Sequence, residues 1–153
     1  MAVRFSTTLG EKGLTDLDRD PRGFAIKFYT EEGIFDMVGN NTPFFFIRDP
    51  IKFPDVIHSR KRHPATNMKD PNMHWDFISL TPESMQNIMF LFSDRGIPHG
   101  YRHMDGFSAH AFRWVNSKGE AFFVKYHIKT DLGHKALHPD QVREIEARTK
   151  DYF

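Results

Sequence analysis

The sequence predicts an α+β fold, because two β-hairpin patterns and two amphipathic helix patterns follow one another along its 153 residues. The hairpins are expected at residues 23–38 and 110–130, and the longer helices at residues 81–92 and 138–148. No repeat, linker or low-complexity tract interrupts this order. We therefore expect residues 1–153 to lie in one domain.

The first hairpin follows an extended run at residues 3–8. Phe24, Ile26 and Phe28 alternate with polar or small residues, which places three apolar side chains on one face of a strand. A short acidic turn containing glycine then leads into a second strand at residues 34–38, so the two runs predict a hairpin.

A run of three phenylalanines at residues 44–46 directly follows the polar Gly-Asn-Asn turn at residues 39–41. An unbroken apolar run is typical of a buried strand, and we expect this strand to end at residues 48–50. Taken alone, the Gly-Asn-Asn segment is ordinary turn chemistry. Next to a phenylalanine wall, the same amides are also suited to a site for a large flat ligand.

Helices are expected in the middle and at the end of the chain. A short helix begins at Pro54 and ends near His58, and residues 58–72 are expected to form a basic loop punctuated by proline. Thr81 is the expected N-cap of the next helix. The packing face of that helix is expected to consist of four apolar side chains at helical spacing: Met85, Ile88, Met89 and Phe92. The last helix, at residues 138–148, has a thin apolar face and needs a partner surface.

The second hairpin is expected to join residues 110–115 to residues 121–130 through a turn at residues 116–119. In its second strand, residues 122, 124, 126 and 128 share one face and the intervening residues share the other.

Composition excludes several classes of protein. The 21 basic and 20 acidic residues nearly cancel, so no overall field favours nucleic acid or a membrane surface. The absence of cysteine excludes disulfides, thiolate-ligated zinc, iron–sulfur clusters and thiol catalysis. No signal sequence or membrane-spanning run is present, so we expect an intracellular protein that is not exported.

Two weaker patterns have ordinary explanations. His103 and His110 are seven residues apart without supporting acidic residues, so we expect hydrogen-bonded histidines and no protein-ligated metal. The basic cluster at residues 58–63 could contact phosphate, but in a nearly neutral chain it is better explained as a solvated loop or a subunit contact.

Six motifs resemble the haem catalases, in the same order and at similar spacing. They are Arg-Phe-Ser-Thr at 4–7, Asp-Pro-Arg-Gly-Phe-Ala at 20–25, Val-Gly-Asn-Asn-Thr-Pro at 38–43, Phe-Phe-Phe-Ile-Arg-Asp-Pro at 44–50, Ser-Asp-Arg-Gly-Ile-Pro at 93–98 and Tyr-Arg-His-Met-Asp-Gly-Phe at 101–107. The resemblance covers essentially the whole chain, which matches a middle portion of a catalase. It implies part of an antiparallel eight-stranded barrel with flanking helices, a buried haem b, a homotetramer, and the conversion of hydrogen peroxide to water and oxygen.

The resemblance also implies roles for individual residues. Asn40 resembles the distal asparagine that hydrogen-bonds peroxide, and Asp20 resembles a residue of the peroxide access channel. The implied cofactor-binding residues are Arg4 at a haem propionate, Ser6 beside the distal histidine, Phe45 and Phe53 in the haem wall, and His110 in the proximal network. Thr8 and Ala109 depart from the family pattern, which usually has valine and serine there.

Some catalases bind NADPH on their outer surface, and the resemblance extends to that site. The matching positions are Gln86, Phe90, Ser93, Arg95, Asp105 and Lys129. Two of them depart from the family, which commonly has histidine at the position of Gln86 and asparagine at that of Asp105. A carboxylate near phosphates is repulsive unless it is protonated or screened.

The Val-Val-His motif of the distal histidine and the Arg-x-Phe-x-Tyr motif of the axial tyrosine have no match in this chain, which looks truncated at both ends relative to catalases. The resemblance therefore implies a catalase segment that is inactive by itself. One alternative is a non-enzymatic remnant or haem-binding interaction module with exposed sheet edges. Another is a relative that acts on lipid hydroperoxides, which would also need an axial ligand.

Overall fold

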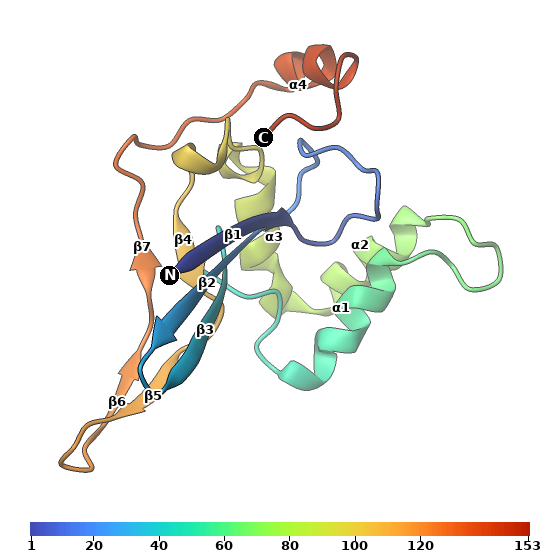
Figure 1. The fold of residues 1–153 in the computed structure, drawn as a ribbon. Coiled ribbons are helices and arrows are strands. Elements are labelled where there is room, and N and C mark those ends of the chain that lie inside the picture. The colour runs from blue at the N-terminus through green and yellow to red at the C-terminus, as the bar shows by residue number, and fades with distance from the viewer.

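The computed structural model describes residues 1–153 and confirms the α+β class (Figure 1). The strands are β1 (Ala2–Thr7), β2 (Arg22–Thr30), β3 (Gly33–Asn40), β4 (Gly106–Ser108), β5 (Phe112–Val115), β6 (Ala121–Val124) and β7 (His127–Ile128). The α-helices are α1 (Phe53–Arg60), α2 (Pro71–Leu80), α3 (Met85–Phe92) and α4 (Pro139–Glu146). Short 3₁₀ turns are η1 (Pro50–Lys52), η2 (Pro82–Ser84), η3 (Asp94–Gly96) and η4 (Tyr101–His103).

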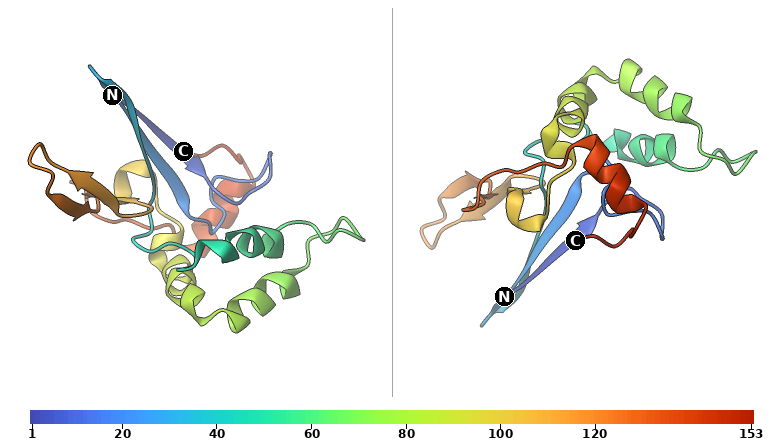
Figure 2. Two further views of the ribbon diagram at one scale, coloured as in Figure 1. Left: turned by 90° about the horizontal axis from the view of Figure 1, so that it is seen from below. Right: turned by 90° about the horizontal axis from the view of Figure 1, so that it is seen from above.

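The main sheet is antiparallel, with strand order β1-β2-β3-β4-β7. Both predicted hairpins form, one from β2 and β3 and the other from β5 and β6. The expected strand at 121–130 is divided into β6 and β7, because β7 pairs with β4 in the main sheet whereas β6 pairs with β5. The β5–β6 hairpin projects as an arm, on a different side of β1–β3 from helices α1 and α2 (Figure 2). The sheet remains open, and no closed barrel forms within this chain.

The phenylalanine run is not a strand, contrary to the sequence prediction. Side chains replace a neighbouring strand as the hydrogen-bond partners of its backbone. The Phe44 carbonyl accepts bonds from Thr42 Oγ1 at 3.0 Å and Asn87 Nδ2 at 3.1 Å. The three rings then diverge: Phe44 contacts Phe90, Phe45 stacks on Phe53, and Phe46 joins a buried cluster.

Helix α2 was not predicted, although its local signals are present. Asp70 is the N-cap, and its Oδ1 accepts the Asn72 N–H at 2.9 Å, while Pro71 occupies the first helical turn. Thr81 ends α2 and is the N-cap residue of η2, which leads into α3, so its predicted position is confirmed, but its side chain makes no capping bond. The α-helical part of that segment begins four residues later, at Met85.

The predicted packing face of α3 is also wrong. Met85, Met89 and Phe92 are 44%, 67% and 58% exposed, whereas Asn87 and Leu91 are buried. The bond from Asn87 to the Phe44 carbonyl turns this side of the helix inward. A buried polar group needs a hydrogen-bond partner. Within this chain, that need decides which face of α3 is buried, and the apolar stripe does not.

Helix α4 forms as predicted, and it has the partner surface that its thin apolar face requires. His138 and Gln141 make a reciprocal capping box at its start. Val142 packs into a buried cluster with Leu17, Ile97 and Leu137, and the partly buried Tyr152 and Phe153 pack against this cluster.

Buried apolar residues form three small clusters in place of one large core. The first lies under α4, the second between β2 and β3 around Phe24, and the third beneath α1 around Phe46. The accessible surface is 10512 Å², whereas a compact monomer of this mass exposes roughly 8,000 Å². The chain therefore presents an unusually large surface to other segments or other chains.

Candidate functional site

Arg4, Ser6 and Asn40 lie on one face of the main sheet. In the antiparallel register, Gly23 is paired with both Ser6 and Asn40, which makes a cross-strand row. Ala25 is likewise paired with Arg4 and Val38 in the next row of this face. Side chains alternate between the two faces of a strand, so the apolar cluster around Phe24 occupies the opposite side. We call the first face the polar face.

Small residues on β2 leave the polar face open and free of large protruding side chains. A Cβ at Gly23 would collide with Ser6 Oγ, so glycine is what allows these two strands to carry a hydroxyl there. Ala25 adds only a methyl group in the neighbouring row, and Val38 beside it is 65% exposed. The result is a shallow surface that can accept a flat ligand.

The two adjacent asparagines have different structural positions. Asn41 is buried, and its Oδ1 accepts the Arg22 N–H at 2.8 Å. Asn40 lies half-buried on the polar face, in register with Phe107 of β4. A Cβ at Gly39 would meet backbone atoms of Phe107 and Phe24, so the close approach of β3 and β4 depends on this glycine. Asn40 is thus flanked by the backbone of β2 on one side and by that of β4 on the other.

Three predicted cofactor-binding residues meet in one pocket. The Phe45 ring stacks on Phe53, with centroids 5.5 Å apart and an interplanar angle of 23°. It also meets the His110 ring edge-on, at 4.8 Å. The pocket is open to solvent, has a volume of about 570 Å³ and is lined in addition by Ile47, Arg48 and Pro50. We call this the aromatic pocket, and it arises because the phenylalanine run is irregular.

The aromatic pocket adjoins the polar face through the backbone. The Ala109 N–H donates to the Val38 carbonyl at 3.1 Å, so the residue before His110 is bound to the strand that carries Asn40. Serine is usual at the position of Ala109 in the resembling family, yet the contact that places His110 here is made by backbone atoms. The loss of a hydroxyl leaves that contact unchanged.

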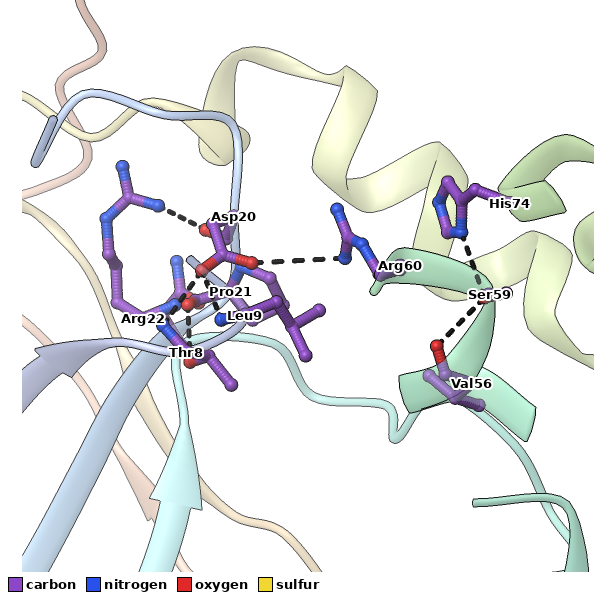
Figure 3. A network of polar contacts seen from close by, with 10 residues as sticks. Thr8, Leu9, Asp20, Pro21, Arg22, Val56, Ser59, Arg60 and His74 are labelled. Carbon is purple, nitrogen blue, oxygen red and sulfur yellow. Dashed lines mark hydrogen bonds and ion pairs between the residues drawn. The ribbon is translucent and has the colours of Figure 1, made fainter. Parts of the chain in front are cut away.

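Asp20 is a buried anchor for the end of β1 (Figure 3). Its Oδ2 accepts the backbone N–H groups of Thr8 and Leu9 at 2.8 and 2.7 Å, and Arg60 Nη1 lies 3.9 Å from Oδ1. The Thr8 hydroxyl donates to the Pro21 carbonyl at 2.6 Å. The proton of this hydroxyl is therefore used within the protein.

His74 lies beside the same network (Figure 3). Its Nδ1 is 3.5 Å from Ser59 Oγ, which donates its own proton to the Val56 carbonyl at 2.8 Å. Burial, followed by the positive charge of Arg60, lowers the pKa of His74 from 6.5 to about 4. His74 is therefore neutral near pH 7.

This shift predicts a loss of stability in acid. Between pH 6.5 and about pH 4 the unfolded state binds a proton at His74 and the folded state does not. The free energy of unfolding therefore falls as the pH falls through this window, by about 1–2 kcal/mol after allowance for the half-exposed ring. The measurement is the urea midpoint across the window for the wild type and His74→Gln. The wild type should lose more stability than the variant, and equal slopes would contradict the assignment.

The NADPH-matching residues are only partly brought together. Phe90, Arg95 and Asp105 line a second pocket of about 290 Å³, and Lys129 approaches it through an ion pair with Asp105. Ser93 is used locally, because its Oγ donates to the Phe90 carbonyl at 2.6 Å. Gln86 is exposed on α3 and does not line this pocket.

Two residues at these sites were not predicted. Arg22 is fully buried, and His134 lies 3.1 Å from Asp105 in the second pocket. Arg22 stands in a recognisable Asp-Pro-Arg motif, which could have marked it, whereas His134 is a single loop histidine without a local pattern. No group of three or more histidine, aspartate or glutamate side chains is arranged to hold a metal ion. None of the helices combines the length and apolar character needed to cross a bilayer.

Comparison with known proteins gives one consistent result. The model of the family described as Catalase matches residues 1–153. The chain is 61% identical over 150 residues to a catalase of Methanosarcina barkeri, covering 98% of this chain and 30% of that protein. It is 59% identical over 152 residues to a catalase of Cavia porcellus, covering 99% of this chain and 29% of the relative.

Solved structures agree with the sequence comparison. A fungal catalase superimposes with a TM-score of 0.91 at 53% identity, over 98% of this chain and 30% of that one. Catalase A from Saccharomyces cerevisiae gives a TM-score of 0.89 at 53% identity, over 98% and 31%. The chain thus spans about 30% of the length of the proteins it matches.

Proposed function

Because this chain belongs to the catalase family, we propose that it forms one wall of the haem pocket in an enzyme that converts hydrogen peroxide to water and oxygen. The observation that carries this proposal is the meeting of Arg4, Ser6 and Asn40 on one open sheet face. The aromatic pocket adjoins that face. We propose that residues 1–153 are part of a single core domain.

Catalases bind haem, and the residues present here fit such a group. A planar macrocycle needs a flat surface and an apolar wall. The small residues Gly23 and Ala25, in neighbouring rows of the polar face, provide the first, and the stacked Phe45 and Phe53 provide the second. Arg4 would hold a propionate with its permanent charge and its fork of donors. When bound, haem supplies the redox chemistry through which one peroxide is reduced to water and a second is oxidised to oxygen.

The proposed role of Asn40 is to orient peroxide. Its amide is neutral, and it offers a donor and an acceptor that do not exchange a proton during the reaction. The backbone contacts of Gly39 and Phe107 hold it in place, so little ordering remains to be done when peroxide arrives. The acid–base step requires a different group, since an amide cannot act as a proton shuttle near pH 7.

The test of the proposed function uses the purified chain titrated with ferric haem. We expect a shift of the haem absorbance that saturates and is weakened in Arg4→Ala. We also expect oxygen evolution from peroxide no faster than with free haem, because no residue of this chain matches the distal histidine or the axial tyrosine. A chain that leaves the haem spectrum unchanged would refute the haem-wall role. A rate well above free haem would refute the dependence on other segments.

A second candidate is a non-enzymatic interaction module. It is favoured by the exposed apolar side chains of α2 and α3, such as Trp75, Met89 and Phe92. Size-exclusion chromatography separates the two proposals. Self-association that persists when haem is bound would support the module, and a monodisperse haem complex would support the pocket wall.

Assembly and location are also proposed from the family. Catalases are generally tetramers, and we propose that the exposed surface of this chain is covered in such an assembly. One relative, from Toxoplasma gondii, is named a peroxisomal catalase and is 58% identical over 150 residues. We accordingly propose the peroxisome or the cytoplasm as the site of action.

A further inference from the structure

The pocket of about 290 Å³ is lined by two cationic side chains, two carboxylates and two histidines, and it shares no lining residue with the aromatic pocket. It is bounded by α3, η3 and the loop around residue 134. Its charged and titratable residues are Asp94, Arg95, His103, Asp105, His134 and Lys135. The basic side chains by themselves would favour an anionic ligand.

Asp105 already supplies an anion to this pocket. Its side chain is only 2% exposed, and its Oδ2 lies 2.7 Å from Lys129 Nζ, 3.1 Å from His134 Nε2 and 3.9 Å from Arg95 Nη1. Its other oxygen, Oδ1, accepts the Thr130 N–H at 3.0 Å. One buried carboxylate is therefore shared by three basic side chains from two separate stretches of the chain.

The carboxylate is held in its charged form. Burial by itself opposes ionisation, but the hydrogen bonds from Lys129 and Thr130 and the nearby His134 outweigh it and lower the pKa of Asp105. At neutral pH the negative charge is thus present where a ligand phosphate would have to approach Arg95, Lys129 and His134. The phosphate would meet repulsion from Asp105, and it would have to displace that carboxylate from its partners.

The residues present therefore do not fit NADPH, although Phe90, Ser93, Arg95 and Lys129 match its site in the resembling family.

We propose that Asp105 determines the specificity of this pocket as a built-in anion, which excludes the phosphates of NADPH from Arg95, Lys129 and His134. Asparagine at this position has nearly the same shape but no charge, so it leaves the three basic side chains available to a ligand. This inference concerns a different site from the proposed haem pocket, and it stands or fails independently of it.

The experiment compares NADPH binding by the wild type and Asp105→Asn, measured through nucleotide fluorescence in low-salt buffer without haem. We expect no saturable binding by the wild type up to the highest NADPH concentration used, and saturable binding by Asp105→Asn with a Kd at least about tenfold below that concentration. The matched control is Asp94→Asn, which removes the same charge from the same pocket but leaves the three ion pairs of Asp105 in place. It should behave as the wild type does.

Saturable binding of NADPH by the wild type would overturn the proposal, and so would equal gains in the two variants. A folded Asp105→Asn chain that does not bind would also overturn it. Circular dichroism establishes whether that variant folds. If it does not, Asp105→Ser takes its place, because it also removes the carboxylate that Arg95, Lys129 and His134 share. Saturable NADPH binding by folded Asp105→Ser would then support the proposal, and its absence in that folded variant would refute it.

Discussion

A chimera in which this chain replaces the matching segment of the Cavia porcellus catalase is expected to degrade hydrogen peroxide. The two sequences are 59% identical over 152 residues, and solved catalases superimpose on this chain with TM-scores near 0.9. The relative contributes the segments that this chain does not match. Because the backbone of the segment is conserved in shape, the polar face and the aromatic pocket should form within the chimera.

Within that chimera, Asn40→Ala is expected to lower kcat by roughly 10²-fold, the usual cost of removing one preorganised hydrogen-bond donor. The effect should fall on kcat, because the amide is proposed to orient peroxide during the reaction and to contribute little to the fold. The matched control is Asn72→Ala, at an exposed position on α2. Initial rates of oxygen evolution measure both. A change of less than about twofold in Asn40→Ala would remove Asn40 from the proposed site.

Arg22→Met is expected to destabilise the chain by about 2–4 kcal/mol. Arg22 is fully buried, its guanidinium donates to the backbone carbonyls of Asp20 and Asp16, and it lies 5.6 Å from the Phe153 ring centroid. Methionine fills much of the volume but leaves both carbonyls without their donors. Burial lowers the pKa of Arg22, but nearby carboxylates oppose this effect and the guanidinium stays charged.

The measurement is the free energy of unfolding in urea, followed by circular dichroism. Arg62→Met is the control, since Arg62 forms an exposed ion pair with Glu11 at 3.0 Å, a kind of contact that contributes little. We expect the midpoint of the control to stay close to that of the wild type. If the two variants lose similar amounts of stability, the carbonyl contacts of Arg22 are not what holds the loop before β2 in place.

The elements with a regular period were predictable from the sequence. The alternation of Phe24, Ile26 and Phe28 identifies β2, because a half-buried strand needs apolar residues on one face only. The phenylalanine run and the α3 stripe misled the prediction for a common reason. In each case the hydrogen bond from Asn87 to the Phe44 carbonyl decides which atoms are buried. Its two partners are 43 positions apart, so no local sequence pattern indicates the contact.

The candidate site likewise combines residues that the sequence pattern can place with residues that only the folded chain brings together. Alternation along β1 is enough to place Arg4 and Ser6 on one face once the strand is known. Their meeting with Asn40 depends on the register of β1, β2 and β3, and the aromatic pocket depends on an irregular loop. The shared carboxylate of Asp105 joins residues up to 29 positions apart, counted from Asp105 to His134. Pairing over such separations is a property of the folded chain.

The three separate apolar clusters bear on how the chain unfolds. A single core makes folding all-or-none, because each part loses its support when another part opens. Clusters joined mainly by loops and one open sheet can open one at a time, each with its own free energy. Cooperative unfolding would then depend on the segments or chains that cover the exposed surface. Amide hydrogen exchange would show whether the cluster under α4 opens with a different free energy from the other two.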